Sequence, residues 1–517
     1  MANKKLFQTL IGKAIPQTDA INHELAPAYT LSPKQRLAQY AVTSCMNNTF
    51  YADAETQLRV VLETCSLLDP EFVAQTAIYA RQHGFMKDMP ALLCAVLATR
   101  DLRLHELVFD KVIDSSKMLR NYVQILRSGV VGRKSLGSAP KRLVQRWLEA
   151  RDEESLFRSS TGANPSLVDI IRMTHPKPGR ASREAFYGFM LGRKHDGEAL
   201  PALVRAFERF KAGESLEVPE LPFTMLSSLP LSERDWVAIA RKSSWQTTRM
   251  NLNTFMRHGV FDAPGLAEHV AAQLRERDQI ERARVFPYQL MAAYMNCDAG
   301  VPLVVRDALQ DALEISISSV PVIEGKVFVC PDVSGSMMSP VTGTRRGATT
   351  KVRCIDVAAL VAAALMRKNP AVVVRPFAEK VVPVELNPRD TVMTNAEKLA
   401  AVGGGGTNCS APLAAWNAEG ANADVVLIVS DNQSWVDAQR GNGTALMREW
   451  AKFRRRNPKA KLLCLDIQPY ATTQAVERED ILNIGGFSDH VFELIALSAS
   501  GKMNADHWVG LIEKVPV

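Results

Sequence analysis

The sequence predicts an all-α region followed by a doubly wound α/β domain. Up to about residue 320, apolar residues recur at three- and four-residue spacing, which is typical of amphipathic helices. Beyond that point, short and continuously apolar runs alternate with helix-forming segments, which is typical of a parallel sheet covered on both faces. The 517 residues are enough for about two to four domains. We therefore expect a helical domain over residues 1–320 and an α/β domain over 321–517.

The helical prediction depends on the spacing within each segment and on the turn signals between segments. Helical spacing is clearest over residues 72–80, 92–97, 104–113 and 203–210. Turn signals such as Asp69-Pro70 and Asn164-Pro165 separate such segments. Because no convincing strand pattern occurs before residue 316, we expect packed antiparallel helices without a strict sequence repeat.

The α/β prediction depends on five apolar runs, at residues 326–331, 371–377, 380–384, 424–430 and 461–467. Helix-forming sequence lies between them, most clearly over 352–368 and near 395–401. In a sheet of this kind, ligands bind beyond the carboxyl ends of the strands. The residues that directly follow the runs are therefore the first candidates for a site.

Composition excludes several classes of protein. Apolar residues make up 47% of the chain and charged residues 23%, so an intrinsically disordered protein is excluded. Eight cysteines without a CxxC pair or zinc spacing indicate reduced thiols rather than a disulfide scaffold. No targeting signal is recognisable, and the most apolar stretch, residues 357–366, is about half the length of a membrane span. We expect a cytoplasmic protein with no membrane partner.

Oxygen-bearing side chains follow two of the apolar runs and a glycine loop. Asp332, Ser334 and Ser336 follow the first run, Thr407 follows Gly403–Gly406, and Asp431 follows the run at 424–430. Two carboxylates and three hydroxyls without His or Cys suit Mg²⁺ better than zinc. An Asp in such a string can also simply cap a helix. The ordered combination of all three segments favours a metal site.

Positive charge is concentrated in one stretch of the helical region. The net charge is +7, and residues 117–147 contain eight basic side chains and no acidic one. Such local purity of sign is typical of a surface that binds a polyanion. A solvated helix face is the alternative interpretation. The basic residues of this stretch are Lys117, Arg120, Arg127, Arg133, Lys134, Lys141, Arg142 and Arg146.

Two resemblances follow from these motifs. The three segments that carry the candidate metal ligands, taken together, resemble the metal-ion-dependent adhesion site of von Willebrand factor A domains. The helical region resembles the TROVE module of the Ro autoantigen and its bacterial orthologues, and the resemblance covers nearly the whole chain. The segments that carry it, in order, are residues 126–134, 140–147, 167–178, 249–253 and 283–290.

The Ro resemblance implies a ring of HEAT-like helical repeats with a basic central hole, joined to the A domain. It implies small noncoding Y-like RNA on an outer basic face and single-stranded 3′ ends of misfolded RNA in the cavity. It further implies cooperation with the exoribonuclease polynucleotide phosphorylase in RNA quality control. Arg172, His175 and Lys177 match a segment of the family where RNA contact is expected, although His175 is equally suited to cap a helix end.

The hypothesis is therefore a monomeric, non-enzymatic RNA-binding scaffold. From the residue types and the resemblance, the candidate RNA contacts are Lys117, Arg120, Arg133, Lys134, Lys141, Arg142, Arg146, Arg172, His175 and Lys177. The alternative is a protein–protein adaptor whose metal site docks an acidic partner. A metal-dependent nuclease is disfavoured, because no histidine lies between His269 and His490 to act as a general base.

Overall fold

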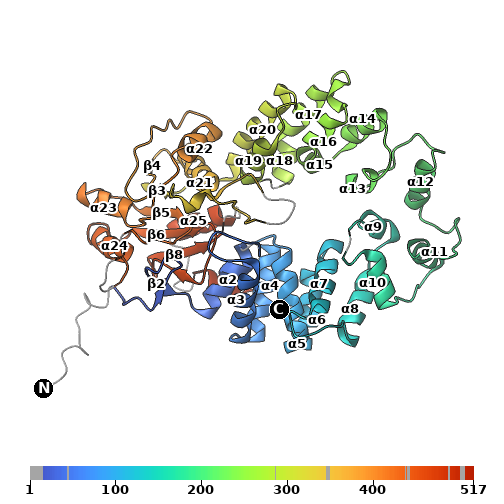
Figure 1. Ribbon diagram of the computed structural model, residues 1–517, viewed down its shortest axis with the longest axis horizontal. Coiled ribbons are helices and arrows are strands. Elements are labelled where there is room, and N and C mark those ends of the chain that lie inside the picture. The colour runs from blue at the N-terminus through green and yellow to red at the C-terminus, as the bar shows by residue number, and fades with distance from the viewer. Residues whose placement is uncertain are drawn as a thin grey trace. The chain divides into compact units, whose positions relative to one another are not determined.

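The fold is described by a computed structural model (Figure 1). It describes residues 15–43, 46–162, 164–283, 285, 287–344, 350–436, 438, 443–486, 490–500 and 507–517. Two compact units are present. The sheet unit comprises Met1–Leu68, Arg275–Asn296 and Asp307–Lys514, and the helical unit comprises Asp69–Leu274, Cys297–Arg306 and Val515–Val517. The domain boundary that the sequence predicts near residue 320 concerns the order of domains along the chain, and it stays a prediction.

The helical unit confirms the all-α prediction for the first part of the chain. Its longest helices occur in its first half, where α5 contacts α4, α6 and α7. Its helices are α4 (Pro70–Gln82), α5 (Asp88–Arg100), α6 (Leu102–Val112), α7 (Ser116–Ser128), α8 (Ser138–Glu149), α9 (Glu153–Arg158), α10 (Leu167–Thr174), α11 (Ala181–Met190), α12 (Ala202–Lys211), α13 (Phe223–Leu226), α14 (Glu233–Lys242), α15 (Trp245–Met250), α16 (Leu252–Arg257) and α17 (Leu266–Arg275).

Burial and capping explain why these segments form helices. Ten of the thirteen residues of α5 are buried, so its sequence is apolar all round rather than on one face. Helix α7 begins where the Ser115 hydroxyl accepts from the Met118 N–H, and ends at Gly129, whose φ of 92° suits glycine. Helix α10 begins with a capping box between Ser166 and Asp169.

The sheet unit contains the predicted parallel sheet. Five strands are ordered β4-β3-β5-β6-β8, and every neighbouring pair is parallel. They are β3 (Val327–Pro331), β4 (Val372–Val374), β5 (Val425–Ser430), β6 (Lys461–Asp466) and β8 (Ile481–Gly485). The apolar run at 380–384 forms no strand, because Val381 makes only an isolated bridge to Phe377. Strand β8 was not predicted.

Helices cover both faces of this sheet (Figure 1). On one face, apolar side chains of β3, β5 and β6 pack with α23 (Ala411–Ala418) and α24 (Ala445–Arg456) in a single core. Trp416 stacks on Phe328 there, with ring centroids 3.8 Å apart. On the other face, α21 (Cys354–Lys368) contacts β3 and β4, and α25 (His490–Ala499) contacts β6. This doubly wound arrangement confirms the predicted fold class of the second part of the chain.

The N-terminal segment belongs to the sheet unit. A hairpin of β1 (Ala20–Ile21) and β2 (Pro27–Thr30) continues through β2 into an antiparallel pair with β7 (Thr472–Thr473). The segment continues into α2 (Pro33–Thr43) and α3 (Ala54–Ser66), and α2 contacts β8 and α26 (His507–Ile512). The expectation that no strand precedes residue 316 was therefore wrong. These strands are too short for an alternating pattern to identify them.

The remaining helices of the sheet unit connect or flank these elements. They are α18 (Arg277–Arg282), α19 (Pro287–Asn296), α20 (Leu303–Ser316, of which the first four residues belong to the helical unit) and α22 (Val392–Ala400). Helix α22 packs against α21.

Candidate functional site

The candidate metal site lies at the carboxyl ends of β3 and β5. Asp332 directly follows β3 and Asp431 directly follows β5. The two strands are parallel neighbours in register, Pro331 opposite Val429, so both carboxylates emerge at the same edge of the sheet. The Asp332 N–H donates to the Val429 carbonyl at 2.8 Å, which fixes the loop after β3 against β5.

The three predicted hydroxyls lie around the Asp332 carboxylate. The Ser334 N–H donates to Asp332 Oδ1 at 2.8 Å, and the Thr407 hydroxyl donates to Ser334 Oγ at 3.0 Å. Ser334 Oγ and Ser336 Oγ are 3.5 Å apart. The structure therefore brings together Asp332, the two serines and Thr407. It adds Ser430, whose hydroxyl donates to Asp332 Oδ2 at 2.6 Å.

The glycine loop positions Thr407. The Gly404 N–H donates to the Val333 carbonyl at 2.9 Å, and the Gly335 N–H donates to the Gly405 carbonyl at 3.0 Å. Gly404 and Gly405 have φ values of 128° and 85°, which side-chain-bearing residues rarely adopt. The run of glycines therefore lets the loop lie directly against the backbone that carries Asp332.

Burial makes this cluster electrostatically unfavourable by itself. Asp332 is fully buried and Asp431 is 2% exposed. Burial raises the pKa of both carboxyl groups above the ordinary value, and the charge of Asp431 raises that of Asp332 further. Two buried carboxylates next to each other require either protonation or a cation. The oxygen-only donor set fits a hard divalent ion such as Mg²⁺, which needs few protein ligands.

Conventional metal-binding residues are few here. Within the described ranges, no group of three or more His, Cys, Asp and Glu side chains is placed to hold a metal. The candidate site has only two carboxylates, those of Asp332 and Asp431, so it does not count as such a group. Their fit to a cation depends on the hydroxyls of Ser334, Ser336 and Thr407.

Two residues near this site were missed by sequence reasoning. The Tyr51 hydroxyl donates to Glu24 Oε1 at 2.9 Å. Burial raises the pKa of Tyr51, and the charges of Asp431 and Glu24 raise it further, while Ser336 acts in the opposite direction. Tyr51 and Glu24 therefore lie beside the candidate metal ligands. Some 300 to 400 residues separate them from Asp332 and Asp431 along the chain, and no local motif marks them.

Five of the predicted RNA contacts are exposed or half-exposed without a partner. Their side chains make no hydrogen bond or ion pair in the part of the chain that the structure describes. They come from α7, the α7–α8 connection, α8 and the segment after α10, all within the helical unit. They are Lys117, Lys134, Lys141, Arg142 and Lys177.

Two other predicted contacts have structural partners. Arg133 is half-buried, and its guanidinium donates to the Ala98 carbonyl in the last turn of α5 at 2.9 Å. Arg120 donates to the Ser159 carbonyl at 3.1 Å, and burial lowers the pKa of its guanidinium. Both side chains thus stabilise helix ends, a role that the sequence did not reveal.

Acidic side chains from elsewhere neutralise part of the predicted basic stretch. Arg146 forms ion pairs with Glu106 at 3.1 Å and Asp110 at 2.7 Å, both on α6. Arg172 lies 3.9 Å from Asp169 on its own helix. The basic stretch contains no acidic residue of its own, but acidic side chains from another helix lie next to it in the folded protein. His175 ends α10 in a left-handed conformation, where its backbone N–H donates to the Ile171 carbonyl. Its side chain is exposed.

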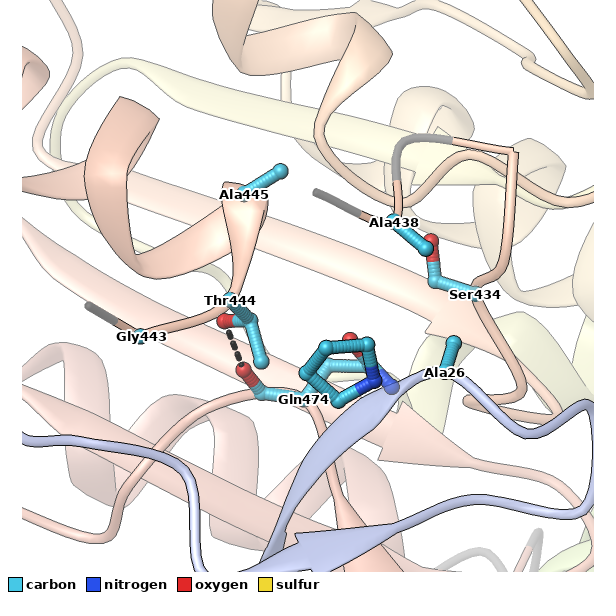
Figure 2. Close-up of a pocket in the computed structure, with 8 residues that line it drawn as sticks. Ala26, Ser434, Ala438, Gly443, Thr444, Ala445 and Gln474 are labelled. Atoms are coloured by element: carbon cyan, nitrogen blue, oxygen red, sulfur yellow. Dashed lines mark hydrogen bonds between the residues drawn. The ribbon is translucent and has the colours of Figure 1, made fainter. Parts of the chain in front are cut away.

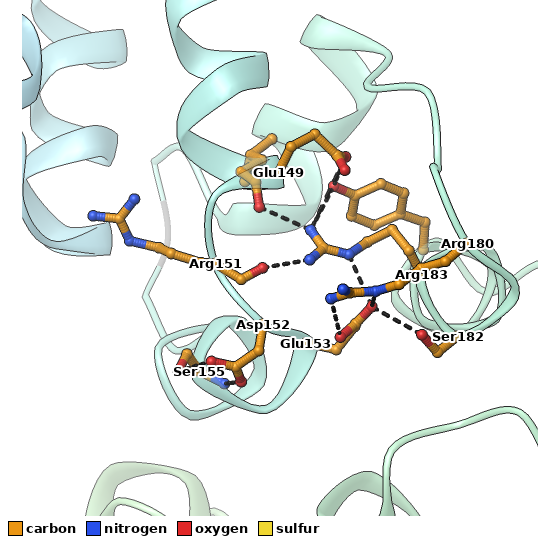
Figure 3. Close-up of polar contacts among 10 residues, drawn as sticks. Glu149, Arg151, Asp152, Glu153, Ser155, Arg180, Ser182 and Arg183 are labelled. Atoms are coloured by element: carbon orange, nitrogen blue, oxygen red, sulfur yellow. Dashed lines mark hydrogen bonds and ion pairs between the residues drawn. The ribbon is translucent and has the colours of Figure 1, made fainter.

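A buried ion pair holds the helices that follow α8 (Figure 3). Arg183 of α11 is 1% exposed, donates to Glu153 Oε1 at 3.1 Å and donates to the Leu148 carbonyl at 2.8 Å. Arg180 adds a bidentate contact to Glu153, with both distances 2.8 Å. Burial acts to raise the pKa of Glu153, but the two arginines together lower it to about 2. This network fixes α8, α9 and α11 to one another.

Comparison with known proteins identifies the second part of the chain. Residues 326–497 match the family model described as the Ro60 vWA domain. Over this segment the chain is similar to the Ro60 A domain. It begins one residue before β3 and ends within α25, so it includes the whole parallel sheet and all five candidate metal ligands.

Similarity to Ro proteins extends beyond the Ro60-type A domain. The chain is 24% identical to the RNA-binding protein RO60 of Deinococcus radiodurans, over 97% of this chain and all of that protein. The crystal structure of the D. radiodurans RO (RSR) protein matches with a TM-score of 0.62 at 19% identity, covering 91% of this chain and all of that one. The predicted resemblance to the Ro autoantigen, with its TROVE-type helical region, is confirmed along nearly the full length.

Helix length bears on the predicted lack of a membrane partner. Among the described residues, no helix combines the length and the apolar character needed to cross a bilayer.

Proposed function

We propose that this protein is a non-catalytic RNA-binding scaffold of the Ro type. Its full-length similarity to a protein named as RNA-binding carries this proposal. The five unpartnered basic side chains of the helical unit support it, because lysine and arginine without acidic partners neutralise phosphates independently of sequence.

The finer parts of the proposal follow the family resemblance. The RNA is a small structured Y-like RNA together with single-stranded 3′ ends of misfolded RNA, and an exoribonuclease, polynucleotide phosphorylase, acts on the bound RNA. The side chains proposed to contact phosphates are Lys117, Lys134, Lys141, Arg142 and Lys177. Arg120, Arg133, Arg146 and Arg172 contribute less, since each already has a partner in the fold.

In the A domain, we propose that Asp332, Ser334, Ser336, Thr407 and Asp431 hold a divalent cation, Mg²⁺. The cation neutralises two buried carboxylates and offers an open position to an acidic group. Asp332 and Asp431 supply charge, and the three hydroxyls supply neutral oxygens. We assign ligand binding, and no catalysis, to this metal site. RNA cleavage is assigned to the partner nuclease.

A charge-reversal experiment tests RNA binding. The double variant Lys141→Glu and Arg142→Glu removes two proposed phosphate contacts, so RNA affinity should fall more than tenfold, and the slope of log affinity against log salt should flatten by about 1 to 2. The matched control reverses Lys398 and Lys452, which pair with Asp390 and Glu449 in the sheet unit. If both double variants lost the same amount of RNA affinity, the loss would reflect net charge alone. That result would overturn the assignment of RNA binding to this surface.

The adaptor alternative has one specific observation in its favour, the partly acid-neutralised surface around Arg146. It predicts that neither double variant changes RNA binding, because specific RNA binding would be absent.

A further inference from the structure

The tip of the N-terminal hairpin is tied to the loop that carries Asp431. Asn22 Nδ2 donates to the Ser434 carbonyl at 2.8 Å, and the His23 N–H donates to Gln433 Oε1 at 2.9 Å. These partners lie two and three residues after Asp431. Asn22 is 4% exposed and Gln433 is fully buried. The hairpin tip is therefore held at the edge of the sheet where the candidate metal site lies.

The shape of the tip is fixed by its own side chain. Asn22 Oδ1 accepts from the N–H groups of Glu24 at 3.0 Å and Ala26 at 2.9 Å, and Leu25 adopts a φ of 59°. Strand β2, which leaves the tip, pairs with β7. On its other side, Ala26 and Pro27 line a pocket of only about 10 Å³ with Ser434, Thr444 and Gln474 (Figure 2). The hairpin thus packs closely on the A domain, and the position of Glu24 is well defined.

Aromatic side chains hold the same position from the other side. His23 stacks on Tyr51 with centroids 5.5 Å apart, and both rings contact Tyr470, at 5.0 and 5.6 Å. The Tyr470 hydroxyl lies 3.2 Å from Thr49 Oγ1. These rings order the Tyr51 hydroxyl that donates to Glu24.

The charge balance at this edge calls for a cation. Glu24 adds a third carboxylate to Asp332 and Asp431, and its charge acts on Asp431. Within the described part of the chain, no lysine or arginine forms an ion pair with any of the three. Tyr51 is neutral and therefore does not compensate the charge of the Glu24 carboxylate that it holds here. A metal ion nearby would stabilise that charge.

We propose that Glu24 is an outer-sphere partner of the A-domain cation, bound through a metal-bound water, and that Tyr51 positions it. This inference rests on the proposed metal site. It assigns the position left open by the five A-domain oxygens to the chain's own N-terminal hairpin. An acidic group of a partner must then displace Glu24 to reach the metal, so the hairpin regulates access to it.

Calorimetric titration of the full-length protein with Mg²⁺ tests the proposal. Glu24→Gln keeps the shape of the exposed side chain and removes its charge, so Mg²⁺ affinity should fall on the order of tenfold. Tyr51→Phe should give a smaller loss in the same direction. Glu55→Gln is the matched control, since it removes an exposed carboxylate from the first turn of α3, and its affinity should equal that of the unmodified protein.

Hydrogen exchange of the hairpin amides gives a second, independent readout. Mg²⁺ should slow exchange at residues 22–26 in the unmodified protein and leave it unchanged in Glu24→Gln. If the unmodified protein binds no Mg²⁺, the metal site itself is wrong. If it binds Mg²⁺ and Glu24→Gln matches it in both affinity and exchange, the site stands and the role of Glu24 is overturned.

Discussion

At the scale of single residues, a charge's partner decides what it can do. Arg142 and Arg146 lie on the same helix and are both exposed, yet among the described residues only Arg146 forms ion pairs with acidic side chains. An arginine that already has two carboxylates must give up those contacts before it can bind a phosphate. Lys134 and Arg133 also differ in their partners. Arg133 donates to the Ala98 carbonyl, whereas the Lys134 side chain has no hydrogen-bond or ion-pair partner among the described residues.

Alanine substitution at these two positions should therefore give unequal results. Arg142→Ala should weaken RNA binding by about 1 kcal/mol, roughly fivefold, and Arg146→Ala by clearly less. Fluorescence anisotropy with a structured RNA measures both. Asp110→Ala supplies the converse, because it leaves Arg146 with Glu106 as its remaining carboxylate partner and should strengthen binding. A larger loss for Arg146→Ala than for Arg142→Ala would contradict the proposed surface.

The two buried carboxylates of the A domain make a residue-scale prediction about stability. Asp332→Asn removes one of two adjacent buried charges, so without metal it should melt at a higher temperature than the unmodified protein at neutral pH. Mg²⁺ should raise the melting temperature of the unmodified protein and leave that of Asp332→Asn unchanged.

Asp390→Asn, at an exposed ion pair, serves as the control for this measurement. It should respond to Mg²⁺ as the unmodified protein does. An Asp332→Asn protein that Mg²⁺ still stabilises would place the cation elsewhere.

The residues of the candidate metal site could be brought together from sequence alone because each follows directly from a local pattern. Asp332 and Asp431 directly follow apolar strands, and Thr407 directly follows a glycine loop. Glu24 and Tyr51 could not be predicted, because only the folding of residues 15–68 onto the sheet brings them to this edge. Arg133 was misread in part, since its partner is a backbone carbonyl in another helix, which no charge pattern shows.

At the scale of elements, continuously apolar runs predicted strands β3, β4, β5 and β6. Strands β3 and β5 are buried at every residue, and their sequences are continuously apolar. Strand β8 is equally buried but contains Asn483, whose amide is satisfied by Glu477 and by the Ala475 carbonyl. That polar residue interrupts the pattern. The run at 380–384 lies outside the sheet, where Val381 makes only an isolated bridge to Phe377; partial burial is not the reason, because the edge strand β4 is also only partly buried.

The ion-pair network of α8, α9 and α11 makes a prediction at this scale. Glu153→Gln leaves the buried Arg183 with only the more distant Glu149, 4.0 Å away, as a carboxylate partner, so the free energy of unfolding should fall by about 3 kcal/mol, measured by chemical denaturation. Glu71→Gln, exposed in the first turn of α4, should change it very little.

The same residue gives a pH dependence. The pKa of Glu153 is lowered to about 2 in the folded protein, below the ordinary value of about 4.3 in an unfolded chain. Its contribution to stability is therefore present above about pH 5 and lost as the pH falls toward 2. Glu153→Gln should show a correspondingly weaker loss of stability between these values. Identical pH profiles would contradict the network's role.

At the scale of the whole molecule, the chain combines a cationic helical unit with a Ro60-type A domain. Both parts have counterparts in the RO60 protein of D. radiodurans, whose sequence aligns over its full length. The proposed division of labour gives RNA phosphates to the helical unit and a cation to the A domain. The N-terminal hairpin packs on the A domain through hydrogen bonds from Asn22 and His23.

The salt dependence of RNA binding tests the central claim most directly. Affinity of the full-length protein for a structured RNA is measured by anisotropy from about 50 to 300 mM KCl. Five basic side chains that have no partner among the described residues, each releasing about 0.7 to 0.9 counterion, predict a log–log slope of roughly −3.5 to −4.5. A slope near zero, or no binding at the lowest salt, would contradict the account.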